Sequence, residues 1–198
     1  MDILEQNLKE IRPKRKSSVK RNDKAYADCL ATTTVELERL VGLYRTTVFE
    51  EDMRARLLRD SIDHHLRRYH KYAIQGRIKS HYNQRGVSMK AKDVIFEHVI
   101  PAGQVRDLLI QGKLSIVQAL NVPTCRVSRH SNQLLNNRGM HDRNGDPWHF
   151  FRRYKNGMAD LNENGNTVFP EFETFNGQII QDLDTWTLRD HFNFFGIV

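Results

Sequence analysis

The sequence predicts an α+β protein that is mostly helical, with a small two-stranded ββα-like element and a helical N-terminal region. Three observations lead to this fold class. Apolar residues recur at three- and four-residue spacing through the first half of the chain. Two short β-branched segments lie at residues 94–100 and 124–127. Capping residues, proline and glycine then mark several short helices around them. With 198 residues, 39% of them hydrophobic, the chain can build the core of a domain of ordinary size.

The N-terminal part is basic. Residues 11–24 carry seven basic side chains, Arg15 and Lys16 among them, and we expect residues 1–24 to form a solvated arm that orders on a phosphate backbone. Residues 25–84 have a helical pattern without proline. The polar face of the second helix in this stretch is rich in cations: Arg54, Arg56, Arg59, Arg67, Arg68, Lys71 and Arg77. Only two acids lie between Arg54 and Lys92, which favours a surface that faces phosphate.

The remaining elements follow from local signals. Pro101 ends the first strand, Gly112 ends a helix, Ser115 and Ser128 are N-caps, and Pro147 is typical of a first helical turn. We expect these elements in order: strand 94–100, helix 104–111, helix 115–120, strand 124–127, helix 128–137, helix 147–157, and a C-terminal helix from residue 187 after loops and short elements. On helix 147–157 we expect the aromatic residues in the core and Arg152 and Arg153 pointing outward.

Charge divides the chain. Residues 1–155 hold 30 basic and 17 acidic residues, whereas residues 156–198 hold one basic and seven acidic residues. A basic body makes nucleic acid the first partner to expect, DNA or RNA, and the acidic segment is expected to pack back on that body or to meet a protein partner. The organisation that we predict has four parts: a basic arm 1–24, a helical basic region 25–92, a core 93–158 that carries the site, and an acidic C-terminal segment 159–198 with its terminal helix.

Several classes of protein are disfavoured. The sequence contains no run approaching the ~18–20 apolar residues that a membrane helix needs. The N-terminus lacks the apolar stretch of a secretory signal, and Cys29 and Cys125 are too few for a four-cysteine zinc site. These features predict a protein of a reducing compartment, the cytoplasm, with no membrane partner.

The stretch 94–135 combines groups that suit phosphodiester chemistry. Glu97 and His98 lie side by side at the end of the first strand, and Asn132 or His130 follows on the later helix. In an ideal strand neighbours point to opposite faces, but twist and bulges at a strand terminus relax that rule, so we expect them to reach one cleft. Oxygen and imidazole ligands can hold a hard divalent ion that stabilises a pentavalent phosphate. A histidine with a pKa of about 6.5 accepts a proton near neutrality.

The segments EHVIP and VSRHSNQLL resemble the His-Me finger, or HNH-type, nucleases. The resemblance covers about a fifth of the chain. It implies two strands and a helix around one ion, Mg²⁺ or Mn²⁺, and hydrolysis of DNA phosphodiester bonds. It places Glu97 and Asn132 (or His130) as metal ligands and His98 as general base. Asn121 is the nearest match to the residue that orients the base, with Thr124 there in another register.

Together with DPWHFFRRYKNGM, these segments also look similar to small phage-encoded endonuclease-like proteins, which implies the host cytoplasm. The residues expected to contact nucleic acid are Arg126, Arg129, Arg67, Arg68, Lys71, Arg15 and Lys16.

A rival interpretation covers the same residues. Residues 114–135 fit the spacing of a non-catalytic helix-turn-helix DNA-binding protein, with Asn121 in the turn and Arg126, Ser128 and Arg129 facing bases. A third hypothesis is a protein-interaction or inhibitor module whose acidic C-terminal segment mimics phosphate.

Overall fold

The computed structural model describes residues 23–47, 53–70, 80–88, 90, 92–140 and 145–198. Within these ranges the chain is an α+β protein with seven α-helices, a four-stranded mixed sheet and a two-stranded hairpin, which confirms the predicted fold class. Arg15, Lys16 and Lys71 lie outside the described residues. No helix in the described ranges is both long and apolar enough to cross a membrane.

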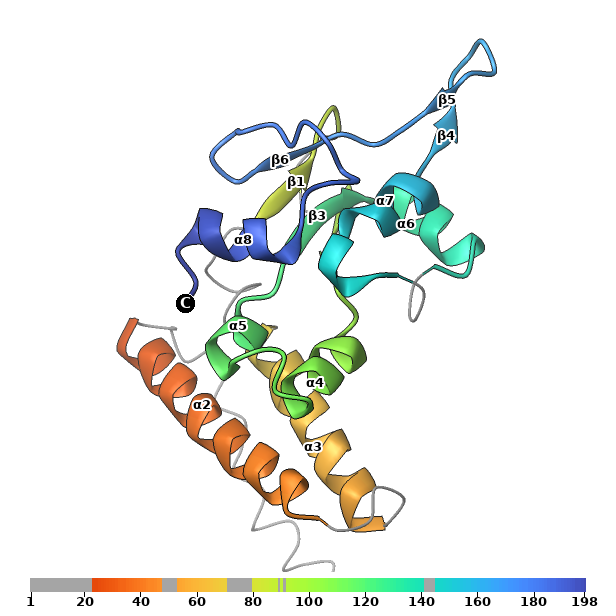
Figure 1. Ribbon diagram of the computed structural model, residues 1–198. Coiled ribbons are helices and arrows are strands. Elements are labelled where there is room, and N and C mark those ends of the chain that lie inside the picture. The colour runs from red at the N-terminus through yellow and green to blue at the C-terminus, as the bar shows by residue number, and fades with distance from the viewer. Residues whose placement is uncertain (1–22, 48–52, 71–79, 89, 91, 141–144) are drawn as a thin grey trace, which may run out of the picture.

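The first two described helices form an antiparallel pair (Figure 1). Helix α2 (Asp23–Arg45) and helix α3 (Met53–Tyr69) pack along each other through the buried residues Leu37, Leu40, Val41, Ala55, Ile62 and Leu66. Helix α4 (Ala102–Ile110) packs against this pair, and the short helix α5 (Ile116–Leu120) follows it. The guanidinium of Arg45 donates to the carbonyls of Leu109 and Ile110, and so it satisfies acceptors at the C-terminal end of α4.

The sheet contains both predicted strands and two more. Its order is β2 (Val94–His98), β3 (Thr124–Ser128), β1 (Tyr82–Gln84) and β6 (Phe172–Thr174). Strand β3 is antiparallel to β2 and parallel to β1, and β6 is antiparallel to β1. The prediction that the helical pattern continues to residue 84 was wrong, because tertiary pairing makes the short segment at Tyr82 a strand.

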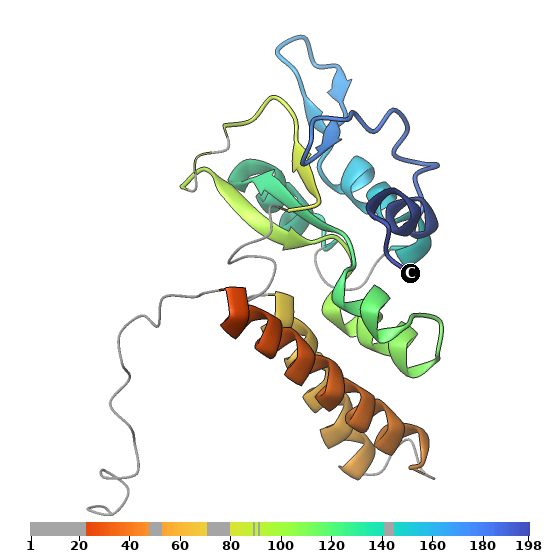
Figure 2. The same ribbon diagram turned by 90° about the vertical axis from the view of Figure 1, so that its left-hand side faces the viewer.

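The strand register separates two faces of the sheet. Glu97 lies beside Cys125, and Phe96 and His98 lie beside Arg126 and Thr124 on the opposite face. The Glu97 face packs on helix α6 (Arg129–Asn137), helix α7 (Phe151–Gly157) and helix α8 (Leu188–Phe195). Near its end, the His98 face meets the C-terminal end of α3 (Figure 2).

Local capping signals predicted the starts of α5 and α6. Ser115 and Thr187 each close a capping box, and Ser128 accepts the amide N–H of Ser131 at the start of α6. The helix predicted from residue 147 is divided into a 3₁₀ turn, Pro147–His149, and α7. Phe150, Phe151 and Tyr154 are in the core as expected, but the prediction was wrong for Trp148, which is 38% exposed.

The acidic C-terminal segment packs back on the basic body, which is one of the two arrangements predicted for it. Arg85 pairs with Glu171 at 2.5 Å and with Glu173 at 3.6 Å, and Lys155 pairs with Asp184. This segment also contributes a hairpin of β4 (Asp160–Leu161) and β5 (Thr167–Val168), which projects from the body (Figure 1).

Candidate functional site

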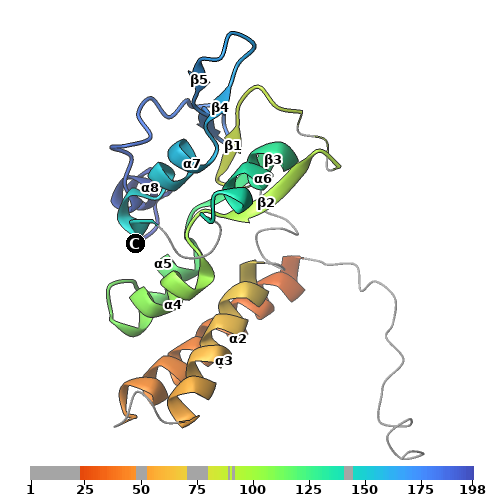
Figure 3. The same ribbon diagram turned by 90° about the vertical axis from the view of Figure 1, so that its right-hand side faces the viewer.

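Strands β2 and β3 and helix α6 form the ββα element that the resemblance implies. The two strands are antiparallel, and the Ser128 cap turns the chain directly from β3 into α6, which packs on both strands (Figure 3). The helix-turn-helix interpretation of residues 114–135 is wrong, because its second helix would have to begin near Pro123 but residues 124–128 are β3.

Glu97 is part of a buried ion pair. Nη2 of Arg153, on α7, donates to Oε1 of Glu97 at 3.1 Å and to the carbonyl oxygen of His98 at 3.2 Å. The side chains of Arg153 and Glu97 are only 3% and 11% exposed. The outward orientation predicted for Arg153 was therefore wrong, whereas Arg152 is exposed as expected. The guanidinium also lies 5.1 Å from the ring centroid of Tyr154.

His98 points to the other face of the sheet. Its ring centroid lies 4.8 Å from that of His70, just after α3, and 5.8 Å from that of Phe96. Burial, and then the cations Arg67 and Arg153, lower the pKa of His98 to about 4. Its Nε2 is buried and has no hydrogen-bond partner among the described residues. The expectation that Glu97 and His98 reach one cleft was wrong, since the regular β-pairing extends to the last residue of β2 and keeps the alternation.

Asn121 ends helix α5. Its Nδ2 donates to the carbonyl of Val117 at 2.8 Å, and its own carbonyl oxygen is 2.9 Å from Nε2 of His191. The side chain is thus bound to its own helix, and the structure does not use it to orient His98.

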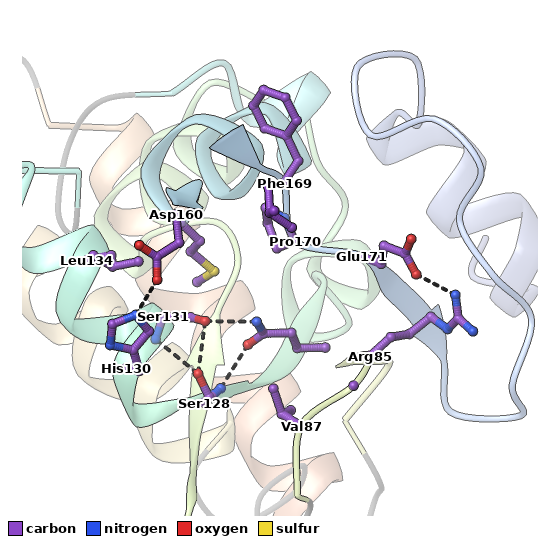
Figure 4. Close-up of a pocket in the computed structure, with 14 residues that line it drawn as sticks. Arg85, Val87, Ser128, His130, Ser131, Leu134, Asp160, Phe169, Pro170 and Glu171 are labelled. Carbon is purple, nitrogen blue, oxygen red and sulfur yellow. Dashed lines mark hydrogen bonds and ion pairs between the residues drawn. The ribbon is translucent and has the colours of Figure 1, made fainter. Parts of the chain in front are cut away.

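Asn132 and His130 lie on different flanks of α6. Two residues along an α-helix correspond to about 200° of rotation, so they cannot serve one site together. His130 faces the hairpin, where its Nε2 lies 2.6 Å from Oδ2 of Asp160 (Figure 4). Oδ1 of Asn132 is buried and finds no hydrogen-bond partner within the described ranges.

A divalent ion does not fit Glu97 in this arrangement. The Arg153 guanidinium already neutralises the carboxylate, and a second cation beside it would be repelled in a site of low dielectric. His98 faces away, and the described residues contain no group of three or more His, Cys, Asp and Glu side chains that could hold a metal ion. The predicted ligands are therefore not assembled.

The predicted nucleic-acid contacts fall into two groups. On α3, Arg67 is paired with Asp63 at 2.6 Å, and Arg68 is exposed. Arg126 lies on β3, and Arg129 is exposed at the start of α6. Near Arg129 the chain also presents Lys90 and Lys92, two exposed cations that no sequence motif had marked as nucleic-acid contacts.

A pocket of about 460 Å³ opens between α6, the end of β1 and the β4–β5 hairpin. Figure 4 shows the His130–Asp160 pair on one side of it, the Arg85–Glu171 pair on the other, and Phe169 between them. Beneath them, Oγ of Ser131 accepts from Nε2 of Gln84 at 2.8 Å and lies 2.9 Å from Oγ of Ser128. Sequence reasoning missed this pocket because its walls come from residues 84–87, 128–134 and 158–171, and only the tertiary fold brings these segments together.

No family model matches this chain, and neither a curated protein nor a solved structure matches it.

Proposed function

We propose that this chain binds nucleic acid through the phosphate backbone, using a basic cluster of Lys90, Lys92, Arg126 and Arg129. One observation carries the proposal: the segments 86–96 and 124–136, which meet along β2 and β3, hold these four cations and a single acid, Asp93. Neutralising phosphates with Lys and Arg releases condensed counterions, which favours binding.

Two hydrogen bonds from Arg129 to backbone carbonyls hold the two segments together. Nε of Arg129 donates to the carbonyl of Lys92 at 2.6 Å, and the Arg129 amide donates to the carbonyl of Asp93 at 3.2 Å. Lys90, Lys92 and Arg129 are exposed, and Arg126 is half-buried beside Phe96 on the face of the sheet opposite α6. The cluster therefore presents positive charge from a rigid sheet end. Arg67 and Arg68, with Lys71, Arg15 and Lys16, are proposed as further backbone contacts.

The salt dependence of binding tests this proposal. We expect fluorescence anisotropy with short DNA and RNA to show affinity that falls steeply with salt, and each of Lys92→Gln and Arg126→Gln to reduce the salt slope by about one. Lys113→Gln is the control, because Lys113 is an exposed cation in the turn after α4. If the cluster variants match Lys113→Gln, or if wild type binds no nucleic acid, the proposal is wrong.

A second candidate is metal-dependent hydrolysis of DNA phosphodiester bonds by the ββα element. Two observations favour it: the order β2, β3, α6, and the buried Oδ1 of Asn132, which has no hydrogen-bond partner among the described residues although such an oxygen normally has one. The ion pair between Glu97 and Arg153 speaks against it.

A plasmid-nicking assay with Mg²⁺ or Mn²⁺ separates the two candidates. Binding alone predicts no nicking by wild type. His64→Ala is the control, because His64 is an exposed histidine. Hydrolysis would be established instead if wild type and His64→Ala cleave the plasmid and His98→Ala does not.

A further inference from the structure

We infer that the pocket between α6 and the β4–β5 hairpin receives one unpaired base of a nucleic-acid strand whose backbone lies on Lys90, Lys92 and Arg129 of the basic cluster. This inference rests on the proposed function and extends it from phosphate contacts to a preference for single-stranded substrate. The volume of about 460 Å³ is within the range of ligand pockets.

The polar groups on the two sides of the pocket are already paired with each other. His130 faces Asp160 at 2.6 Å, and Arg85 faces Glu171 at 2.5 Å. Both carboxylates and the Arg85 guanidinium already have a partner in the protein, so these groups are not free to bind a strongly charged ligand. A neutral ligand with hydrogen-bonding edges suits it better.

The uncharged lining suits a flat ring. Leu134, Met158 and Phe169 supply apolar and aromatic surface, and the Phe169 side chain is 48% exposed although it lies beside the pocket. The ammonium of Lys155 lies 5.4 Å from the Phe169 ring centroid on this side of the molecule. Bases stack on such rings in a sequence-tolerant way, and an unpaired base can be turned out of the strand to do so.

The polar side chains at the bottom of the pocket are held in place by hydrogen bonds within the protein. Gln84 accepts the amide of Ser128 at 2.9 Å and donates to Ser131 at 2.8 Å. Ser128 also begins α6, and the next residue is Arg129 of the basic cluster. Ser128 and His130, the two sequence neighbours of Arg129, both line the pocket, so a strand bound at Arg129 lies close enough to insert a base.

Matched phenylalanine variants test the inference. Phe169→Ala removes the ring beside the pocket, whereas Phe175→Ala removes a ring that is equally exposed, 47%, but does not line it. We expect Phe169→Ala to weaken binding of a single-stranded oligonucleotide by about 5- to 150-fold, which corresponds to the loss of one stacked base. Its affinity for the matching duplex should stay within twofold of wild type, and Phe175→Ala should leave both affinities unchanged.

A second measurement leaves the protein intact. Replacing single bases of the oligonucleotide by abasic sites should weaken binding at one position, and 2-aminopurine placed there should be quenched on binding.

The outcomes separate the two proposals. If wild type binds no nucleic acid, the proposed function fails together with this inference. If the cluster variants weaken binding but Phe169→Ala behaves like Phe175→Ala, or no abasic position matters, backbone binding stands and the base pocket is refuted.

Discussion

The two flanks of helix α6 differ in how deeply their paired polar side chains are buried. On the closed flank, defined by Glu97 and Arg153, a carboxylate and a guanidinium face each other and are almost inaccessible to solvent. On the open flank, defined by His130, Asp160 and Phe169, the paired His130 and Asp160 side chains are exposed to solvent and border a pocket. A buried charge that the chain neutralises itself does not require a ligand, whereas an exposed, preorganised pocket can accept one. For this reason we place the interaction with nucleic acid on the open flank.

The largest expected effect is on the closed flank. Arg153→Met leaves the Glu97 carboxylate buried without its guanidinium, and we expect the free energy of unfolding to fall by about 3–5 kcal/mol. Urea denaturation measures this change. In the double variant Arg153→Met/Glu97→Gln much of the loss should be recovered, because no buried charge is left uncompensated. A loss below about 1 kcal/mol in the single variant would mean that the flank is not closed.

Buried and exposed histidines should affect stability differently as the pH falls. Burial lowers the pKa of His70 to about 3 and of His98 to about 4, below the ordinary value of 6.5. The unfolded chain therefore binds more protons between pH 6.5 and these values, so stability is full above pH 6.5 and declines as the pH falls. At pH 5, each of the two histidines should lower the free energy of unfolding by up to about 2 kcal/mol.

Urea denaturation at pH 7, 6 and 5 measures that decline. His70→Gln should reduce the decline by up to about 2 kcal/mol at pH 5, with the other buried histidines accounting for the rest, whereas the exposed His64→Gln should leave it unchanged. A stability that is constant from pH 7 to 5 would contradict neutral, buried imidazoles.

The contact between α6 and α7 predicts a smaller effect. A Cβ at Gly157 would lie 2.4 Å from Cδ2 of Leu135 and 3.1 Å from Sδ of Met140. We expect Gly157→Ala to destabilise the protein by about 1–3 kcal/mol through overpacking. Gly42→Ala in α2, where nothing lies within 4 Å, should instead stabilise it by up to about 1 kcal/mol. Thermal denaturation of the two variants compares them directly, and equal shifts would show that the helices are not tightly packed here.

The smallest expected change in stability is that of a substitution on the open flank. The side chains of His130 and Asp160 are 66% and 50% exposed, and exposed pairs often contribute nothing measurable. We expect His130→Ala to leave the urea midpoint unchanged. A destabilisation comparable to that of Arg153→Met would remove the distinction between the two flanks.

Local signals in the sequence predicted much of this fold. β-Branched residues marked β2 and β3, and the hydroxyls of Ser115, Ser128 and Thr187 marked the starts of helices, because both effects act within a few residues. Strands β1 and β6 were not predicted, since segments of three residues become strands only through pairing with distant partners.

The site was less predictable than the fold. Glu97 and Arg153 are 56 residues apart, and nothing local distinguishes Arg153 from its exposed neighbour Arg152. The resemblance predicted the order of the ββα element, but it could not reveal that a guanidinium from a later helix would neutralise the predicted metal ligand.

Hydrogen–deuterium exchange of the full chain, with and without a single-stranded oligonucleotide, tests most directly which flank meets nucleic acid. We predict slower exchange on binding in peptides covering residues 84–93, 128–134 and 167–171, with no change in residues 151–157. Protection confined to residues 94–101 and 151–157, with the hairpin and the start of α6 unaffected, would contradict binding on the open flank.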